Sequence, residues 1–197
     1  MAEDYADIAT LRLMTKVEED DPRHVLLQRA LTSASRSIDQ TCGRRFWLDP
    51  EPVARTYRLA GRTVSEPDGD VLLVDDIGGP DITVRTAGSG DLWSPTTGHE
   101  TVPDNALAVG RPVTGLLRPG GTWGHGRGRV QVTARFGWPV VPDDIAQAAL
   151  IQAARLWRRK DSPEGVTGSA EWGVVRLSRR DPDVWNLIEQ YVLPGFG

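Results

Sequence analysis

The sequence has little of the chemistry that most enzymes and metal proteins need. It contains one cysteine, Cys42, so no internal disulfide can form and the fold must rest on an apolar core. A zinc site needs three or four ligands at workable spacing, whereas His24, His99 and His125 are scattered along the chain. The sequence therefore predicts neither a disulfide scaffold nor a structural zinc site.

Motifs of the common enzyme classes are also missing. The two lysines, Lys16 and Lys160, follow Met14 and Arg158 at the spacing where a PD-(D/E)xK nuclease needs an acid. No GxSxG is present, and the glycines of GGTWGHGRG lack the GKS or GKT ending of a phosphate-binding loop. Paired carboxylates of the glycosidase kind stay open, because any two of the 27 acidic residues could be chosen. We expect a protein that is not an enzyme and that has no catalytic residues, metal or cofactor.

Long apolar runs are absent as well. None approaches the ~20 residues of a membrane span, and the acidic start MAEDYADIAT lacks the basic-then-apolar pattern of a secretory signal. We therefore expect no membrane contact and a chain that stays in the cytoplasm where it is made. The 197 residues fit one domain, or one domain with a sizeable insertion.

Charge is distributed unevenly along the chain, although the net charge is only −4. Residues 1–24 hold seven acidic against three basic side chains, and residues 155–180 hold seven basic against three acidic ones. One interpretation is complementarity between one end of a subunit and the other end of its neighbour. The other is two solvated faces that never meet, and the sequence does not decide between them.

Periodicity predicts an α+β fold. We expect a small bundle of three to four helices, built from residues 1–43 and 139–197, with a β-rich insertion at 44–138. A short helix is expected at residues 5–13. A longer one should begin at Asp21 and Pro22 and end at Gly43. Its apolar side chains share an arc of roughly 160°; they are Leu26, Leu27, Ala30, Leu31, Ala34, Ile38 and Cys42.

Short β-favouring runs separated by turn clusters fill the middle of the chain. The expected strands are Arg55–Leu59, Val71–Val74, Ile82–Thr86, Ala106–Val109, Val113–Leu117 and Val130–Phe136.

A third helix is expected from Asp143 or Asp144 to Lys160, and its apolar residues sweep about half of its circumference. That width implies contacts on two sides, either within the fold or with another subunit. A strand at Val174–Leu177 and a final helix at Val184–Tyr191, started by Asp181 and Pro182, complete the prediction.

Tryptophan is the abundant aromatic residue, with seven copies. It offers a large area with one polar group and is favoured at interfaces. We place Trp47 and Trp138 in the core, and Trp172 and Trp185 at an interface.

Three stretches together resemble one protein family. They are SASRSIDQTCGRRFWLDP (33–50), RVQVTARFGWPVVPDDIAQAALIQAARLWRRKDSPEGV (129–166) and RDPDVWNLIEQY (180–191). In this order they are similar to the head–tail connector (adaptor, or head completion) proteins of long-tailed double-stranded DNA phages. The motifs cover roughly a third of the chain, and the β-rich segment matches only loosely.

The resemblance implies a structural virion protein of the neck, between capsid and tail, assembled in the host cytoplasm. Family members form a homo-oligomeric ring, typically a dodecamer, beneath the portal protein. The ring extends the DNA channel and offers a platform to the next neck, stopper or tail-completion protein. Contact with genomic DNA is expected to be transient and independent of sequence, since tight binding would stall ejection.

Three sets of candidate residues follow. By resemblance, the portal or neck interface is expected at Trp185, Leu187, Ile188, Tyr191 and Phe196. The broad third helix and the loop after it suggest subunit contacts at Leu150, Ala154, Trp157 and Trp172. The basic residues of the same region are candidates to face the channel and its DNA; they are Arg158, Arg159, Lys160, Arg179 and Arg180.

A different class of function stays open beside the connector. A sequence-nonspecific DNA-binding packaging component would carry most of its 23 basic residues on one face. The acidic total and the lack of a recognition-helix pattern favour the connector.

Overall fold

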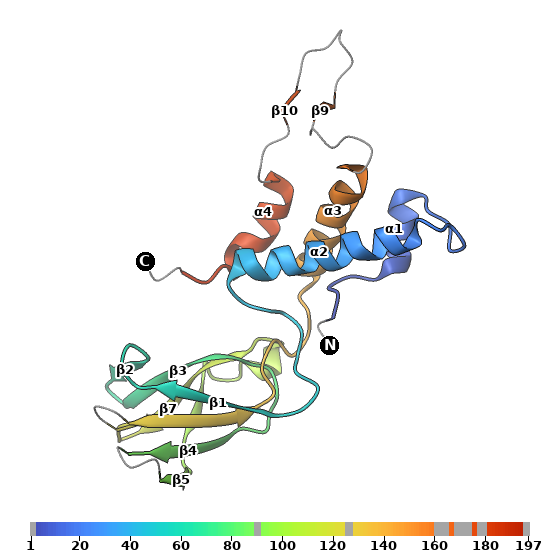
Figure 1. The fold of residues 1–197 in the computed structure, drawn as a ribbon. Coiled ribbons are helices and arrows are strands. Elements are labelled where there is room, and N and C mark those ends of the chain that lie inside the picture. Colours follow the sequence, from blue (N-terminus) through green and yellow to red (C-terminus); the bar gives the residue numbers. More distant parts are fainter. Residues whose placement is uncertain are drawn as a thin grey trace. The chain divides into compact units, whose positions relative to one another are not determined.

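The computed structural model describes residues 3–88, 92–124, 128–159, 166–167, 175–176 and 181–194. The chain divides into two compact units. One, the helical unit, is formed by residues 1–45 and 141–197, and the other, the β unit, by residues 46–140. The described residues form four α-helices and two four-stranded antiparallel sheets (Figure 1), so the predicted α+β class is confirmed.

The first two helices of the helical unit are α1 (Ile8–Thr15) and α2 (His24–Cys42). The Asp7 carboxylate caps α1 by accepting a 3.1 Å hydrogen bond from the Thr10 amide. Gly43 ends α2 as predicted, with the left-handed φ of +66° that glycine tolerates. The predicted start of α2 is too early, because Asp21 accepts from the Arg23 amide at 2.8 Å and the helix begins only after Arg23.

Two further helices complete the unit. They are α3 (Asp143–Arg159) and α4 (Pro182–Ile188), and a 3-10 turn, η2 (Glu189–Tyr191), continues α4. The predicted cap of α4 is confirmed, since Asp181 accepts from the amides of Asp183 and Val184 at 2.8 and 3.3 Å. Between α3 and α4, the short strands β9 (Val166–Thr167) and β10 (Val175–Arg176) pair antiparallel.

The apolar girdle of α3 is covered within the chain. α3 packs against α1, α2 and α4 (Figure 1). Its buried residues are Ile145, Ala148, Ala149, Leu150, Ala153, Ala154 and Trp157. Of the two explanations that the sequence left open for the width of this girdle, contact within the fold therefore accounts for it.

The β unit contains two sheets. The first has the order β1-β8-β4-β5, and the second β2-β3-β7-β6. The strands are β1 (Val53–Arg58), β2 (Thr63–Glu66), β3 (Gly69–Ile77), β4 (Thr83–Ala87), β5 (Trp93–Thr96), β6 (Glu100–Val102), β7 (Val113–Pro119) and β8 (Arg129–Ala134). The strand predicted at Ala106–Val109 is wrong, because a 3-10 turn, η1 (Leu107–Val109), occupies this segment and ends at Gly110 with φ of +72°.

One apolar core joins the two sheets. Its largest fully buried members include Leu72 of β3, Leu116 of β7, Val130 of β8 and Phe136. Trp123 belongs to it, and its indole N–H is satisfied by the carbonyl oxygens of Asp70 and Leu116, each at 2.9 Å.

The two tryptophans predicted to lie in the core differ in burial. Trp138 is buried, and its ring centroid lies 5.3 Å from that of Phe46. Trp47 is only half-buried.

A close backbone approach in the β unit generates the first prediction. Gly137 has φ of +113°, and a Cβ placed there would lie 2.0 Å from the Trp47 carbonyl oxygen. Gly137→Ala should therefore lower the free energy of unfolding by ~2 kcal/mol or more, through backbone strain and steric conflict. Urea denaturation followed by tryptophan fluorescence measures the loss.

Gly98→Ala is the matched control. Gly98 has φ of +75° with open space around the new Cβ, so strain alone applies and the expected loss is about 1 kcal/mol. Equal losses for the two variants would show that the contact between Gly137 and Trp47 does not limit the fold.

Candidate assembly surfaces

Polar side-chain contacts join the antiparallel helices α3 and α4 at both ends of the pair. The Arg155 guanidinium, in the last part of α3, pairs with the Asp181 carboxylate that caps α4. At the other end, Gln190 Nε2 and the Tyr191 hydroxyl donate to Asp144 Oδ2 at 3.0 and 3.3 Å. These polar contacts fix the position of α4 on α3 and thereby the orientation of its aromatic residues.

The segment that follows η2 is attached to the end of α2. The Leu193 amide donates to the Cys42 carbonyl at 2.9 Å, and the Leu193 Cβ lies close to Gly43. The Leu193 side chain nevertheless keeps 42% of its surface exposed. The end of α2 thus carries an apolar side chain supplied by a distant part of the chain.

Cys42 is a core residue rather than a reactive one. Its side chain has no exposed surface, and burial raises the pKa of the thiol to about 11. At neutral pH it is a protonated thiol, whereas a cysteine nucleophile acts as the thiolate. No group of three or more potential metal ligands occurs among the residues the structure describes. Within the same residues, no helix has the length and apolar character to cross a bilayer.

The candidate portal residues differ in how much surface they offer. Trp185, Leu187 and Tyr191 are half-buried on the α4–η2 segment, so each retains area for a partner. Ile188 is only 3% exposed and packs within the helical unit, close to Cys42. Phe196 lies outside the described residues.

The candidate subunit contacts on α3 are largely covered by the chain itself. Leu150, Ala154 and Trp157 are each 8% exposed, so little of their surface is left for another subunit. Trp172 lies outside the described residues.

The candidate channel residues are described only in part. Arg158 and Arg159 are exposed in the last turn of α3. The other three members of this set, Lys160, Arg179 and Arg180, fall in segments that the structure does not describe.

A segment with exposed apolar residues, which the sequence did not predict, runs from the last turn of α1 to the first turn of α2 (residues 13–26). We call it the α1–α2 end. Its apolar members are Leu13 (83% exposed), Met14 (44%), Val25 (58%) and Leu26 (49%). Glu18, Glu19 and Asp20, all exposed, lie on the connection between the two helices.

Leu26 shows why helical periodicity alone did not predict these exposed residues. It belongs to the apolar arc of α2 that was predicted to be buried, yet it is 49% exposed, whereas Leu27 and Leu31 of the same arc are buried.

The carboxylate that caps α4 yields a prediction. Asp181→Ala removes both the amide acceptor and the partner of Arg155, and should cost about 1–2 kcal/mol of unfolding free energy in urea denaturation. Asp181→Asn keeps an oxygen that can cap the helix, so its loss should be clearly smaller. If Asn and Ala cost the same, the cap contributes nothing and the attachment of α4 rests on the ion pair.

The chain is similar in fold to proteins of known structure, although its sequence matches no family. No protein-family model matches the sequence, and no curated protein matches it.

A solved structure described as the neck of an empty GTA particle, computed with C6 symmetry, contains a similar chain. The match has 18% sequence identity and a TM-score of 0.50, and covers 98% of this chain and 92% of that one. A chain from the neck of a native GTA particle, computed with C12 symmetry, matches at 19% identity with a TM-score of 0.46, over 100% and 98% of the two chains. Over nearly its whole length, this protein has the fold of a chain in the first of these structures.

Proposed function

We propose that this protein is a structural subunit of the neck of a tailed phage or phage-like particle. Several identical copies, twelve by resemblance, form a ring beneath the portal protein. The ring continues the DNA channel and presents a platform to the next neck or tail-completion protein. The observation that carries the proposal is the likeness in fold to a chain from a GTA neck, over 98% of this chain and 92% of that one.

The sequence resemblance gives independent support, because it rests on residues rather than on the path of the backbone. Its stretches 33–50, 129–166 and 180–191 contain much of α2, all of β8 and α3, and all of α4. The three helices pack together through α3. The resembling residues thus include much of α2 and all of α3 and α4 in the helical unit, together with β8 of the β unit, as expected for a shared subunit architecture.

The described surfaces fit a ring subunit. A ring of identical copies needs two unlike patches that meet head to tail. The described helical unit exposes more than one kind of surface, including the α1–α2 end, the half-buried aromatic residues of α4 and η2, and the basic last turn of α3. In this proposal, Arg158 and Arg159 face the channel and contact passing DNA weakly and without reading sequence.

The proposal predicts where assembly stops when the protein is missing. Cells that produce particles without this gene product should accumulate mature heads and complete tails that remain separate. Adding the purified protein to these heads and tails should restore joined, infectious particles. Electron microscopy and plaque or transfer titres measure the two outcomes.

The same experiment tests the alternative function. A DNA-binding packaging component acts before the head is filled, so the late addition of protein would restore nothing. Joining of heads to tails at the normal rate without the protein would contradict the connector function itself.

A further inference from the structure

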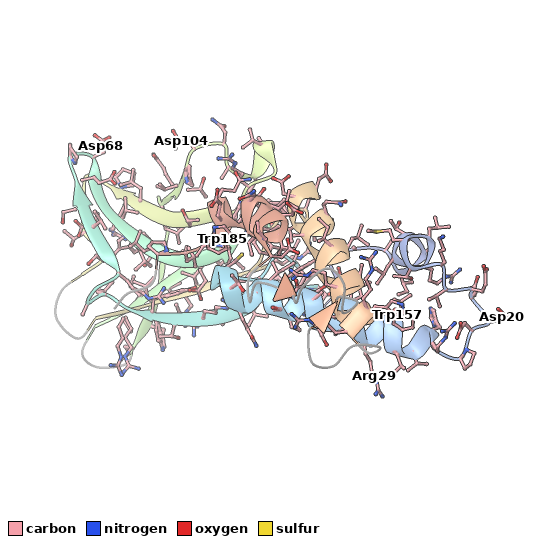
Figure 2. All side chains as sticks on the ribbon, turned by 90° about the horizontal axis from the view of Figure 1, so that it is seen from above. Asp20, Arg29, Asp68, Asp104, Trp157 and Trp185 are labelled. Atoms are coloured by element: carbon pink, nitrogen blue, oxygen red, sulfur yellow. The ribbon has the colours of Figure 1, made fainter. Side chains whose placement is uncertain are left out.

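The two ends of α2 lie far apart and differ in chemistry. The helix has 19 residues, and at about 1.5 Å rise per residue it spans about 28 Å. Figure 2 shows Asp20 beyond its start and Trp185 of α4 near its other end, within the same helical unit. Because α2 is one continuous helix, the distance between these two surfaces is fixed.

The first surface, the α1–α2 end, combines apolar and acidic groups. Leu13 is 83% exposed and Val25 58%, so both keep apolar surface that a partner can cover. Glu18 and Asp20 lie on the connection between the two helices and are exposed. The connection also carries the exposed Lys16 and Arg23, but Arg23 pairs with Asp21, so the acidic groups are in excess. An apolar surface with an acidic border fits a partner surface that is apolar with a basic border.

The second surface, the α2 C-terminal end, has this composition. Arg44 and Arg45 follow Gly43 directly, and both are partly exposed. Leu193, 42% exposed, is held beside them by the hydrogen bond from its amide to the Cys42 carbonyl. One apolar residue and two cationic residues therefore occur at this end of α2, and the Arg45 charge also acts on the Asp39 carboxylate of the same helix.

We propose that the α1–α2 end of one copy docks on the α2 C-terminal end of a second copy of this chain. In this contact Leu13, Val25 and their neighbours cover Leu193, and the carboxylates of Glu18 and Asp20 face the guanidinium groups of Arg44 and Arg45. The inference rests on the proposed ring and names the surfaces that close it. Because the two patches are unlike and lie on opposite ends of one helix, the contact repeats head to tail from copy to copy, which is the kind of interface that a closed ring needs.

The basic last turn of α3 is a weaker candidate for the acidic surface. Arg158 and Arg159 are exposed there, but no large apolar residue among those described in α3 is exposed. A contact with this turn would leave Leu13 and Val25 in water. The turn therefore serves as the control in the test.

A charge-swap experiment tests the pairing. Glu18→Lys/Asp20→Lys reverses the acidic border and leaves the Arg12–Glu19 ion pair in place. Arg45→Glu reverses the basic border. Each variant alone should weaken self-association, measured by sedimentation velocity over a range of protein concentrations, by about tenfold or more. An equimolar mixture should associate about as well as the wild-type protein, because each reversed surface then meets its reversed counterpart in alternating copies.

Two further variants keep the test decisive. Arg158→Glu/Arg159→Glu makes a comparable change of charge on α3 and should leave association unchanged. Leu13→Ser alters only an exposed side chain, so the variant should fold while its self-association weakens. If Arg45→Glu does not fold, Leu13→Ser provides the test of the docking pair instead. Circular dichroism and thermal unfolding check each variant.

The outcomes separate the two proposals. Wild-type protein that stays monomeric up to its solubility limit, or a mixture that fails to restore association, would overturn the docking pair. In either case the chain could still be found by imaging at the neck of particles, and the proposed function would stand. Absence of the chain from the neck removes the proposed function, whatever the charge swap shows.

Discussion

The structure of the helical unit depends on the burial of α3 among α1, α2 and α4. Seven of its side chains are buried, and burial of a large aliphatic side chain contributes about 1.5–3 kcal/mol. Small residues on the same helix, such as Ala149 and Ala153, allow the neighbouring helices to approach closely. Asp144 and Asp181 then hold α4 against α3 at its two ends. A helix covered in this way has little surface left for another subunit, so in the proposed ring the contacts between copies fall to the surfaces around it.

Because α3 is covered, the residues that stabilise the fold differ from those proposed for assembly. The residues that make the fold are inside the unit, and substitutions there act on the free energy of unfolding. The residues proposed for assembly lie in or next to helix ends and are exposed or partly exposed, and substitutions of the exposed ones, such as Leu13, cost little stability. The β unit has its own core, which its two sheets share. A chain built in this way can keep its fold while its exposed surfaces change.

Much of the fold was predictable because the signals are local. The 3.6-residue period of α2 and α3, the glycine after α2, and the Asp181–Pro182 start of α4 depend only on neighbouring residues. The strands of the β unit that the sequence missed are β2, β5 and β6, which form three of the four edges of its two sheets and have mostly polar or exposed residues. The sequence also missed the short strand β9 of the helical unit. At Ala106–Val109 the β-favouring composition was overruled by a turn that Gly110 ends.

The assembly surfaces were harder to predict for a physical reason. Periodicity shows that a residue faces the apolar side of a helix, but not whether anything covers it there. Trp157 and Leu26 carry the same signal, yet Trp157 is buried by its own chain and Leu26 is 49% exposed. Only the lengths and packing of the neighbouring helices decide between the two, and they are properties of the whole unit. The same limit applies to the surface formed by Leu193 and Arg45, which are 148 positions apart in the sequence.

The claim that α3 is covered by its own chain, while partners use the ends of α2, can be tested by hydrogen exchange. Amide exchange would be measured by mass spectrometry on the isolated protein and on the assembled ring. The account predicts that α3 is equally protected in both states, and that protection on assembly appears at residues 13–26 and near residues 44 and 193. Strong new protection of α3 on assembly, with no change at the ends of α2, would contradict it.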